Sequence, residues 1–287
     1  MSFMSFEKEP EELQDRREKA LTEMEELEMP ESIRTPGRTW TRLPEVDDIS
    51  AGEVDPRVEL QGDAEVFTGG EAVEQAGEKL LDAVKQDENR LNALHTVKMN
   101  SLVYVDAPGE AEVEVEYTGD SATFAHLVVD AGKSSEVTVR EYFRGSGEVT
   151  SSIGEFYVGK NASVSYGSVQ SGETALNYVA RRAVVSRDGS MRWLNSVFGA
   201  ELSKQQLETV LEGDSSSTEM LGAFYPVGEQ HHDVSMRVRH RGENTSCEMN
   251  TRGVVDDRAR SAYEGLQDVG QDAEETSSFQ HENTLML

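Results

Sequence analysis

The feature that most constrains the fold is a long series of short alternating runs within residues 101–287. Apolar and polar residues alternate in each run, as in a strand with one buried face. Turn-forming clusters separate the runs every 10 to 15 residues or so, and no helical crossover interrupts the series. The runs are SLVYVD, EVEVEY, FAHLVVD, EVTVREYF, SVSYGSV, MRWLNSVF, QQLETVL and DVSMRVRH. This pattern argues against a doubly wound α/β sheet and leaves a β-solenoid and a β-sandwich equally open.

The first hundred residues carry a helical pattern instead. Apolar residues at helical spacing predict one helix over residues 7–29 and a second over residues 71–86, with a further turn around Leu91 and Leu94. A loop with Pro36, Gly37 and Pro44, and one or two short strands in EVDPRVELQGDAEVF, are expected between the helices. The predicted organisation is therefore an N-terminal helical and mixed segment, residues 1–100, and a β-rich core, residues 101–287.

The charge balance limits the partners. The chain has 55 acidic and 27 basic residues, for a formal net charge of −28. A phosphate backbone or an anionic membrane surface would repel such a protein, so neither nucleic acid nor membrane is expected as a partner. The N-terminus lacks the apolar run of a signal peptide, and no stretch reaches the ~20 apolar residues of a membrane span. We interpret the acidity as that of a cytoplasmic protein from a halophile, where concentrated salt screens self-repulsion.

Three weak candidates for metal ligands lie in HHDVSMRVRHRGENTSC, residues 231–247: His232, His240 and Cys247. Cys247 is the only cysteine, which excludes an internal disulfide and a single-chain multi-cysteine metal site. Strand alternation places His240 on an apolar face, where a buried, hydrogen-bonded imidazole is the simpler interpretation, and Cys247 reads as a small core residue. His231 and His232 are adjacent, so they should point to opposite faces of a strand.

Catalytic constellations are not evident in the sequence. Gln230 and Asp233 could form an acid–base pair, but we interpret them as turn residues. The serines of EGDSSST have no histidine placed for a nucleophilic triad. No glycine-rich segment has the spacing of a phosphate-binding loop, so we predict no catalytic and no cofactor-binding residue.

The segment from Trp193 to Leu287 resembles the SufB/SufD family, the scaffold subunits of the SUF iron–sulfur cluster assembly machinery. Upstream, NRLNALHTVKMNSLVYVDAPGEAEVEV and AHLVVDAGKSSEVTVREYFRG are similar to the start of the family's β-helix, and LEMPESIRTPGRTW is similar to its N-terminal region. The matching skeleton is Gly199, Leu211, Gly213, Gly222, Gln230, Asp233, His240, Thr245, Ser246, Gly253, Asp256, Ala262, Tyr263, Gly265, Gln280, Asn283 and Leu285.

The resemblance implies a mainly β protein, a right-handed parallel β-helix (β-solenoid) with an N-terminal helical segment. It implies a non-catalytic scaffold that forms a dimer through its β-helix with a SufB-like subunit and works with a SufC-like ABC ATPase. The chain alone would bind no cofactor, and an iron–sulfur cluster would be held transiently in the complex. The scarcity of cysteine favours the SufD branch.

The sequence stops at Leu287, before the C-terminal helical region expected for the family, so a fragment or a shortened relative is expected. Two alternatives stay open at this point. One is a carbohydrate-active β-helix enzyme, which would need secretion and clustered carboxylates. The other is a truncated paralogue with a purely structural role.

Overall fold

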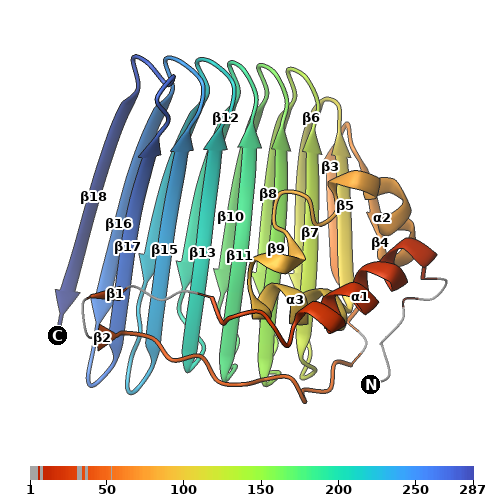
Figure 1. The fold of residues 1–287 in the computed structure, drawn as a ribbon, viewed down its shortest axis with the longest axis vertical. Coiled ribbons are helices and arrows are strands. Elements are labelled where there is room, and N and C mark those ends of the chain that lie inside the picture. The colour runs from red at the N-terminus through yellow and green to blue at the C-terminus, as the bar shows by residue number, and fades with distance from the viewer. Residues whose placement is uncertain (1–5, 7–8, 31–33, 36–37, 53) are drawn as a thin grey trace.

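The chain winds into a parallel β-solenoid made of two facing sheets (Figure 1). The computed structural model describes residue 6 and residues 9–30, 34–35, 38–52 and 54–287. Successive strands alternate between the sheets, so that β6, β8 and the later even-numbered strands form the even sheet, and β5, β7 and the later odd-numbered strands form the odd sheet. The neighbouring coil strands are all parallel, which confirms the β-helix prediction and rules out the antiparallel sandwich.

The strands of the coils are β5 (Ser101–Ala107), β6 (Glu110–Tyr117), β7 (Thr123–Ala131), β8 (Glu136–Phe143), β9 (Val149–Val158), β10 (Ser163–Gln170), β11 (Leu176–Val185), β12 (Ser190–Val197), β13 (Leu202–Leu211), β14 (Ser217–Phe224), β15 (His231–His240), β16 (Ser246–Val255), β17 (Arg260–Val269) and β18 (Ser277–Met286). They include the eight alternating runs of the sequence. Others, such as β9 and β11, have long buried stretches that alternation does not identify.

Stacking of successive coils forms the core. In the even sheet, Ser163 pairs with Ser190, and Ser190 pairs with Ser217, on three consecutive coils. Because the strands keep this register, the inward-facing residues of one coil stack on the inward-facing residues of the next. Aromatic rings fill the lumen between the sheets: the ring centroids of Trp193 and Phe156 are 5.0 Å apart and meet edge to face. Trp193 is fully buried, and its indole N–H donates to Thr209 Oγ1 at 2.9 Å, which satisfies its one polar atom.

The two sheets differ in what covers their outer faces. The residues of β8 alternate between buried and partly exposed, as in a sheet with one solvated face. The residues of β7 and β9 are almost all buried, because the N-terminal helices pack against the outside of the odd sheet. Figure 1 shows these helices beside the early coils, and the described residues between the first helix and β3 reaching the later ones.

The N-terminal segment is more broken than predicted. Its helical and short strand elements are α1 (Glu11–Glu23), β1 (Arg34–Thr35), β2 (Arg38–Thr39), β3 (Arg57–Gly62), β4 (Glu65–Thr68), α2 (Gly69–Ala76), two 3₁₀ turns (Gly77–Lys79 and Gln86–Glu88) and α3 (Arg90–Lys98). The helix predicted over residues 7–29 is too long, because α1 starts after Pro10 and ends at Glu23; Glu7 and Lys8 lie outside the described residues. So do Pro36 and Gly37 of the predicted loop.

The helix predicted over residues 71–86 is also wrong beyond Ala76. Gly77 takes a φ of 51°, in the left-handed region, which stops α2. The turn expected around Leu91 and Leu94 belongs to a separate helix, α3, whose N-terminus is capped by Asn89 through the Asn92 amide at 3.0 Å. The predicted short strands exist as β3 and β4, which pair antiparallel with β6 and β5 and cover the first coil.

Candidate functional site

The three candidate metal ligands do not form a metal-binding group in the described residues. His232 and His240 are both buried on β15, but eight positions along a strand separate them by roughly 26 Å. Cys247 lies on the opposite sheet, in β16. Among the described residues, no group of three or more His, Cys, Asp or Glu side chains is arranged to hold a metal ion.

The surroundings of His240 and Cys247 show that both are parts of the packed interior. His240 shares its inward face with Val234, Met236 and Val238, as alternation predicted, and its Nδ1 lies 2.8 Å from Thr245 Oγ1. Burial lowers the pKa of His240, so the imidazole is neutral at pH 7. Burial, with a smaller contribution from Glu248, raises the pKa of Cys247 to about 12. The sulfur is therefore a buried thiol rather than a reactive thiolate.

His231 and His232 point to opposite sides of β15, as predicted for adjacent strand residues. His232 is fully buried and donates from Nε2 to the carbonyl of Gly199 at 3.1 Å. His231 is half-buried on the outside, where its Nε2 lies 2.8 Å from Thr41 Oγ1. The two imidazoles therefore take part in separate contacts.

The interpretation of Asp233 as a turn residue is wrong. Asp233 lies within β15 and is fully buried, and its Oδ1 accepts a hydrogen bond from the buried Lys204 ammonium at 2.9 Å. Its Oδ2 accepts from the hydroxyl of Thr41, which comes from the N-terminal segment. Gln230 does lie in a turn, where its side-chain oxygen accepts from the Val227 amide at 3.0 Å. Asp233 thus fixes the N-terminal segment to the solenoid, and no acid–base pair exists with Gln230.

Acidification should destabilise the fold through His232. Burial lowers the pKa of His232 from 6.5 to about 4, although hydrogen bonds to the backbone at Gly199 and Ala200 partly oppose this shift. Between pH 6.5 and about pH 4, the imidazole of His232 is therefore protonated in the unfolded chain but neutral in the folded protein. The contribution of His232 to stability is complete above pH 6.5 and falls as the pH drops, by up to about 1.4 kcal/mol per pH unit.

The variant His232→Gln keeps an N–H for the Gly199 carbonyl but cannot titrate. Urea unfolding of both proteins between about pH 7 and about pH 5 should show a shallower loss of stability in the variant. Parallel pH profiles would contradict the assignment of this loss to His232.

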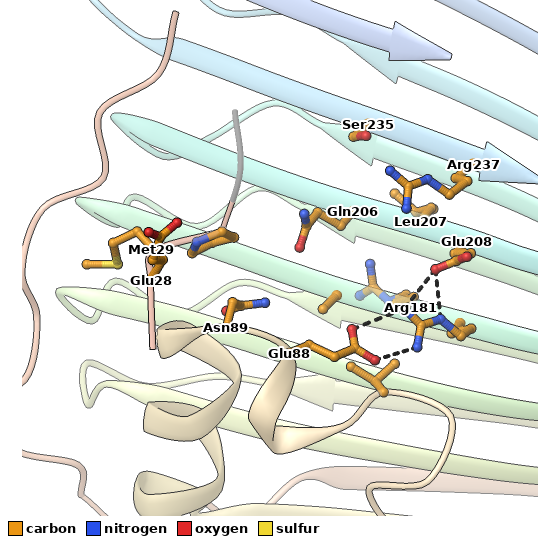
Figure 2. Close-up of a pocket in the computed structure, with 14 residues that line it drawn as sticks. Glu28, Met29, Glu88, Asn89, Arg181, Gln206, Leu207, Glu208, Ser235 and Arg237 are labelled. Atoms are coloured by element: carbon orange, nitrogen blue, oxygen red, sulfur yellow. Dashed lines mark hydrogen bonds and ion pairs between the residues drawn. The ribbon is translucent and has the colours of Figure 1, made fainter. Parts of the chain in front are cut away.

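The cleft in Figure 2 lies between the N-terminal segment and the outer face of the odd sheet and has a volume of about 410 Å³. Arg182 makes two contacts with Glu88, at 2.6 and 3.1 Å, and a third with Glu208 at 2.7 Å. Glu208, on β13, also pairs with Arg239 on β15, the strand of the next coil. The two arginines and two glutamates neutralise one another. Their ion pairs hold the 3₁₀ turn that carries Glu88 against three strands of the solenoid.

A buried polar cluster beneath α3 was missed by the sequence analysis. Glu155 is fully buried on β9 and accepts from the backbone amides of Leu81 and Val84 at 2.7 and 2.9 Å. It also lies 2.9 Å from Nε2 of His126, whose ring centroid is 5.5 Å from that of His95. The Glu155 carboxylate supplies hydrogen-bond acceptors for backbone amides of a turn outside the regular helices and strands. It therefore anchors the helical layer on the odd sheet. The one sign of this cluster in the sequence was an acidic residue, Glu155, inside the run SSIGEFYV.

The glycines of the sequence skeleton have a packing explanation. A Cβ on Gly213 would lie 1.9 Å from the backbone nitrogen of Arg187 in the neighbouring coil, and one on Gly199 would lie 2.4 Å from the carbonyl oxygen of Gly172. These glycines allow adjacent turns to approach at the coil spacing. They are therefore a signature of the stacked fold rather than of a ligand site.

Together, the coils and their close-packed corners define a parallel β-solenoid whose polar clusters join a helical layer to one of its two sheets. Residues 114–287 match the family model described as SUF system FeS cluster assembly, SufBD core domain. The chain belongs to this family, as the sequence resemblance predicted. The matched residues begin within β6 and include every later coil.

Individual relatives agree with the family assignment. The chain is 28% identical over 221 residues to the iron–sulfur cluster assembly protein SufD of Bacillus subtilis (strain 168), a match covering 72% of this chain and 51% of the relative. It is 23% identical over 247 residues to a SufBD family protein of Staphylococcus saprophyticus, covering 80% and 53%. A chloroplastic SufBD family protein of Arabidopsis thaliana is 27% identical over 175 residues, covering 54% and 30%.

The chain thus spans about half the length of the Bacillus and Staphylococcus relatives it matches. Within the described residues, every helix is too short or too polar to cross a membrane.

Proposed function

We propose that this protein is a non-catalytic scaffold subunit of the SUF machinery, and that it supports iron–sulfur cluster assembly together with a SufB-like subunit and a SufC-like ABC ATPase. The observation that carries the proposal is the match of residues 114–287 to an iron–sulfur cluster assembly family, together with the solenoid that those residues form. The cluster would be the cargo of the whole complex. The scarcity of cysteine favours a SufD-like role, with the SufB-like subunit supplying cluster ligands.

Co-expression of the tagged protein with a SufB-like and a SufC-like subunit tests the proposal. We expect a stable complex that retains iron and sulfide when purified without oxygen, whereas the protein alone should retain neither in stoichiometric amount and should hydrolyse no ATP.

Failure to capture either subunit, or stoichiometric iron and sulfide on the isolated chain, would contradict the scaffold role.

A further inference from the structure

A groove lies where the N-terminal segment crosses the corners of the later coils. One wall is the strap, which we define as residues 40–44. The strap is held by Thr41, which is buried and donates its hydroxyl proton to Asp233. Because the hydroxyl has a single proton, Thr41 Oγ1 must accept the hydrogen bond from Nε2 of His231 at 2.8 Å. Lys204 holds the other oxygen of Asp233 at 2.9 Å, so the anchor is a connected, buried network.

The buried hydrogen bonds of Thr41 determine where the adjacent residues of the strap lie. With Thr41 turned inward, Trp40 and Arg42 on either side of it line the groove, and Trp40 is 41% exposed. The lining also includes Arg258, from the turn before β17, and Arg260, the first residue of β17. Apolar atoms of the strap and of the coil corners complete the lining: Leu43, Pro44, Ala175 and Leu202.

The charge of the groove is opposite to that of the molecule. The whole chain has a net charge of −28, but three arginines and only two glutamates line the groove. One glutamate, Glu229, pairs with Arg258 at 2.5 Å, and both side chains are about four-fifths exposed. In the described residues, neither Arg42 nor Arg260 has a carboxylate within ion-pair distance. Two arginine forks are thus available for oxyanions, which they bind in a planar, bidentate manner.

The size and shape of the groove indicate the kind of ligand. Its volume of about 1200 Å³ exceeds the range of about 300–1000 Å³ typical of small-molecule sites. Its lining is apolar as well as cationic, so a single small oxyanion would leave most of this volume empty. An extended peptide can place carboxylates on the arginines and an apolar side chain against the Trp40 ring at the same time.

We propose that this groove docks an acidic peptide segment of a partner protein, through carboxylate pairs with Arg42 and Arg260 and an apolar contact with Trp40. The proposal is independent of the scaffold role, because it concerns a surface of this chain that can be tested without the other SUF subunits.

Selection from a phage-displayed library of random peptides against the whole protein is the test. We expect enriched peptides to contain Asp or Glu beside an apolar residue. Their binding should change the fluorescence of Trp40, because the other tryptophan, Trp193, is fully buried. The double variant R42E/R260E should weaken binding by at least about tenfold, and replacing the acids of the peptide by amides should do the same. The variant Trp40→Phe should remove the fluorescence change.

The control variant is Arg192→Glu, because Arg192 is an exposed arginine on the even sheet that does not line the groove; this variant should leave binding unchanged. If R42E/R260E does not fold, R42Q/R260Q supplies the same comparison. No acidic consensus, or equal binding by the double variant and the wild type, would overturn the proposal. Saturation of the same fluorescence change by inorganic phosphate, with displacement of the peptide, would also overturn it and indicate a small-anion site.

Discussion

Replacing Arg181 by methionine is expected to lower the free energy of unfolding by about 3–5 kcal/mol. Arg181 and Glu141 are almost completely buried between the two sheets, with Nη2 and Oε2 3.5 Å apart. The guanidinium also donates to Ser152 at 3.0 Å and lies over the ring of Tyr166, 5.0 Å from its centroid. Without its counter-ion, the Glu141 carboxylate is only partly compensated for its desolvation, by the Tyr166 hydroxyl that donates to it.

A double-mutant cycle separates this cost from simple loss of packing. The variant Arg181→Met/Glu141→Leu removes both charges, so it should be less destabilised than the sum of its single variants by more than about 1 kcal/mol. Urea unfolding followed by the emission of the buried Trp193 measures each variant. Arg192→Met, which removes an exposed ion pair with Glu219, should cost less than about 1 kcal/mol. Additive effects of the two buried substitutions would show that the pair is not coupled.

Gly213→Ala is expected to destabilise the protein by about 3 kcal/mol, at the upper end of what overpacking usually costs. The new Cβ would lie 1.9 Å from the nitrogen and 2.4 Å from the Cα of Arg187. Both are backbone atoms of the neighbouring coil, so no side-chain rotation relieves the clash. Gly213 does not have a positive φ, and its amide donates to the Val185 carbonyl at 3.0 Å. The cost therefore arises from the distance between coils and not from backbone conformation.

Gly167→Ala is the matched control for this substitution. Gly167 lies in β10, its nearest neighbour to a new Cβ is the Leu194 carbonyl oxygen at 4.0 Å, and its φ is not positive. The substitution should be neutral or stabilising by up to about 1 kcal/mol, because alanine reduces the conformational freedom of the unfolded chain. Thermal and urea unfolding of both variants measure the difference. If the two glycines tolerated alanine equally, close stacking of the coil corners would not explain the glycine at position 213.

Several features of the site could not be predicted from the sequence. The adjacent residues Arg181 and Arg182 look alike in the run LNYVARRAVV, yet one lies in the lumen beside Glu141 and the other pairs with Glu88 outside. Strand alternation predicts that they face opposite ways but cannot say which faces inward, because β11 is buried on both sides. Asp233 resembled a turn residue because its partners, Lys204 and Thr41, are distant in the sequence.

The sequence by itself determined a long series of short strands separated by turns, because such a series depends on local periodicity and on turn residues. The choice of a solenoid over a sandwich, and the family, came from the resemblance carried by a spaced skeleton that includes Gly199 and Gly213. It also determined that His240 would face inward among apolar residues, since a strand has a period of two. Only the tertiary structure decided which sheet the helices cover, which charges are buried, and that the strap meets β17 to form an arginine-lined groove. These features depend on contacts between residues far apart in the chain, whose geometry is fixed only when the coils stack in register.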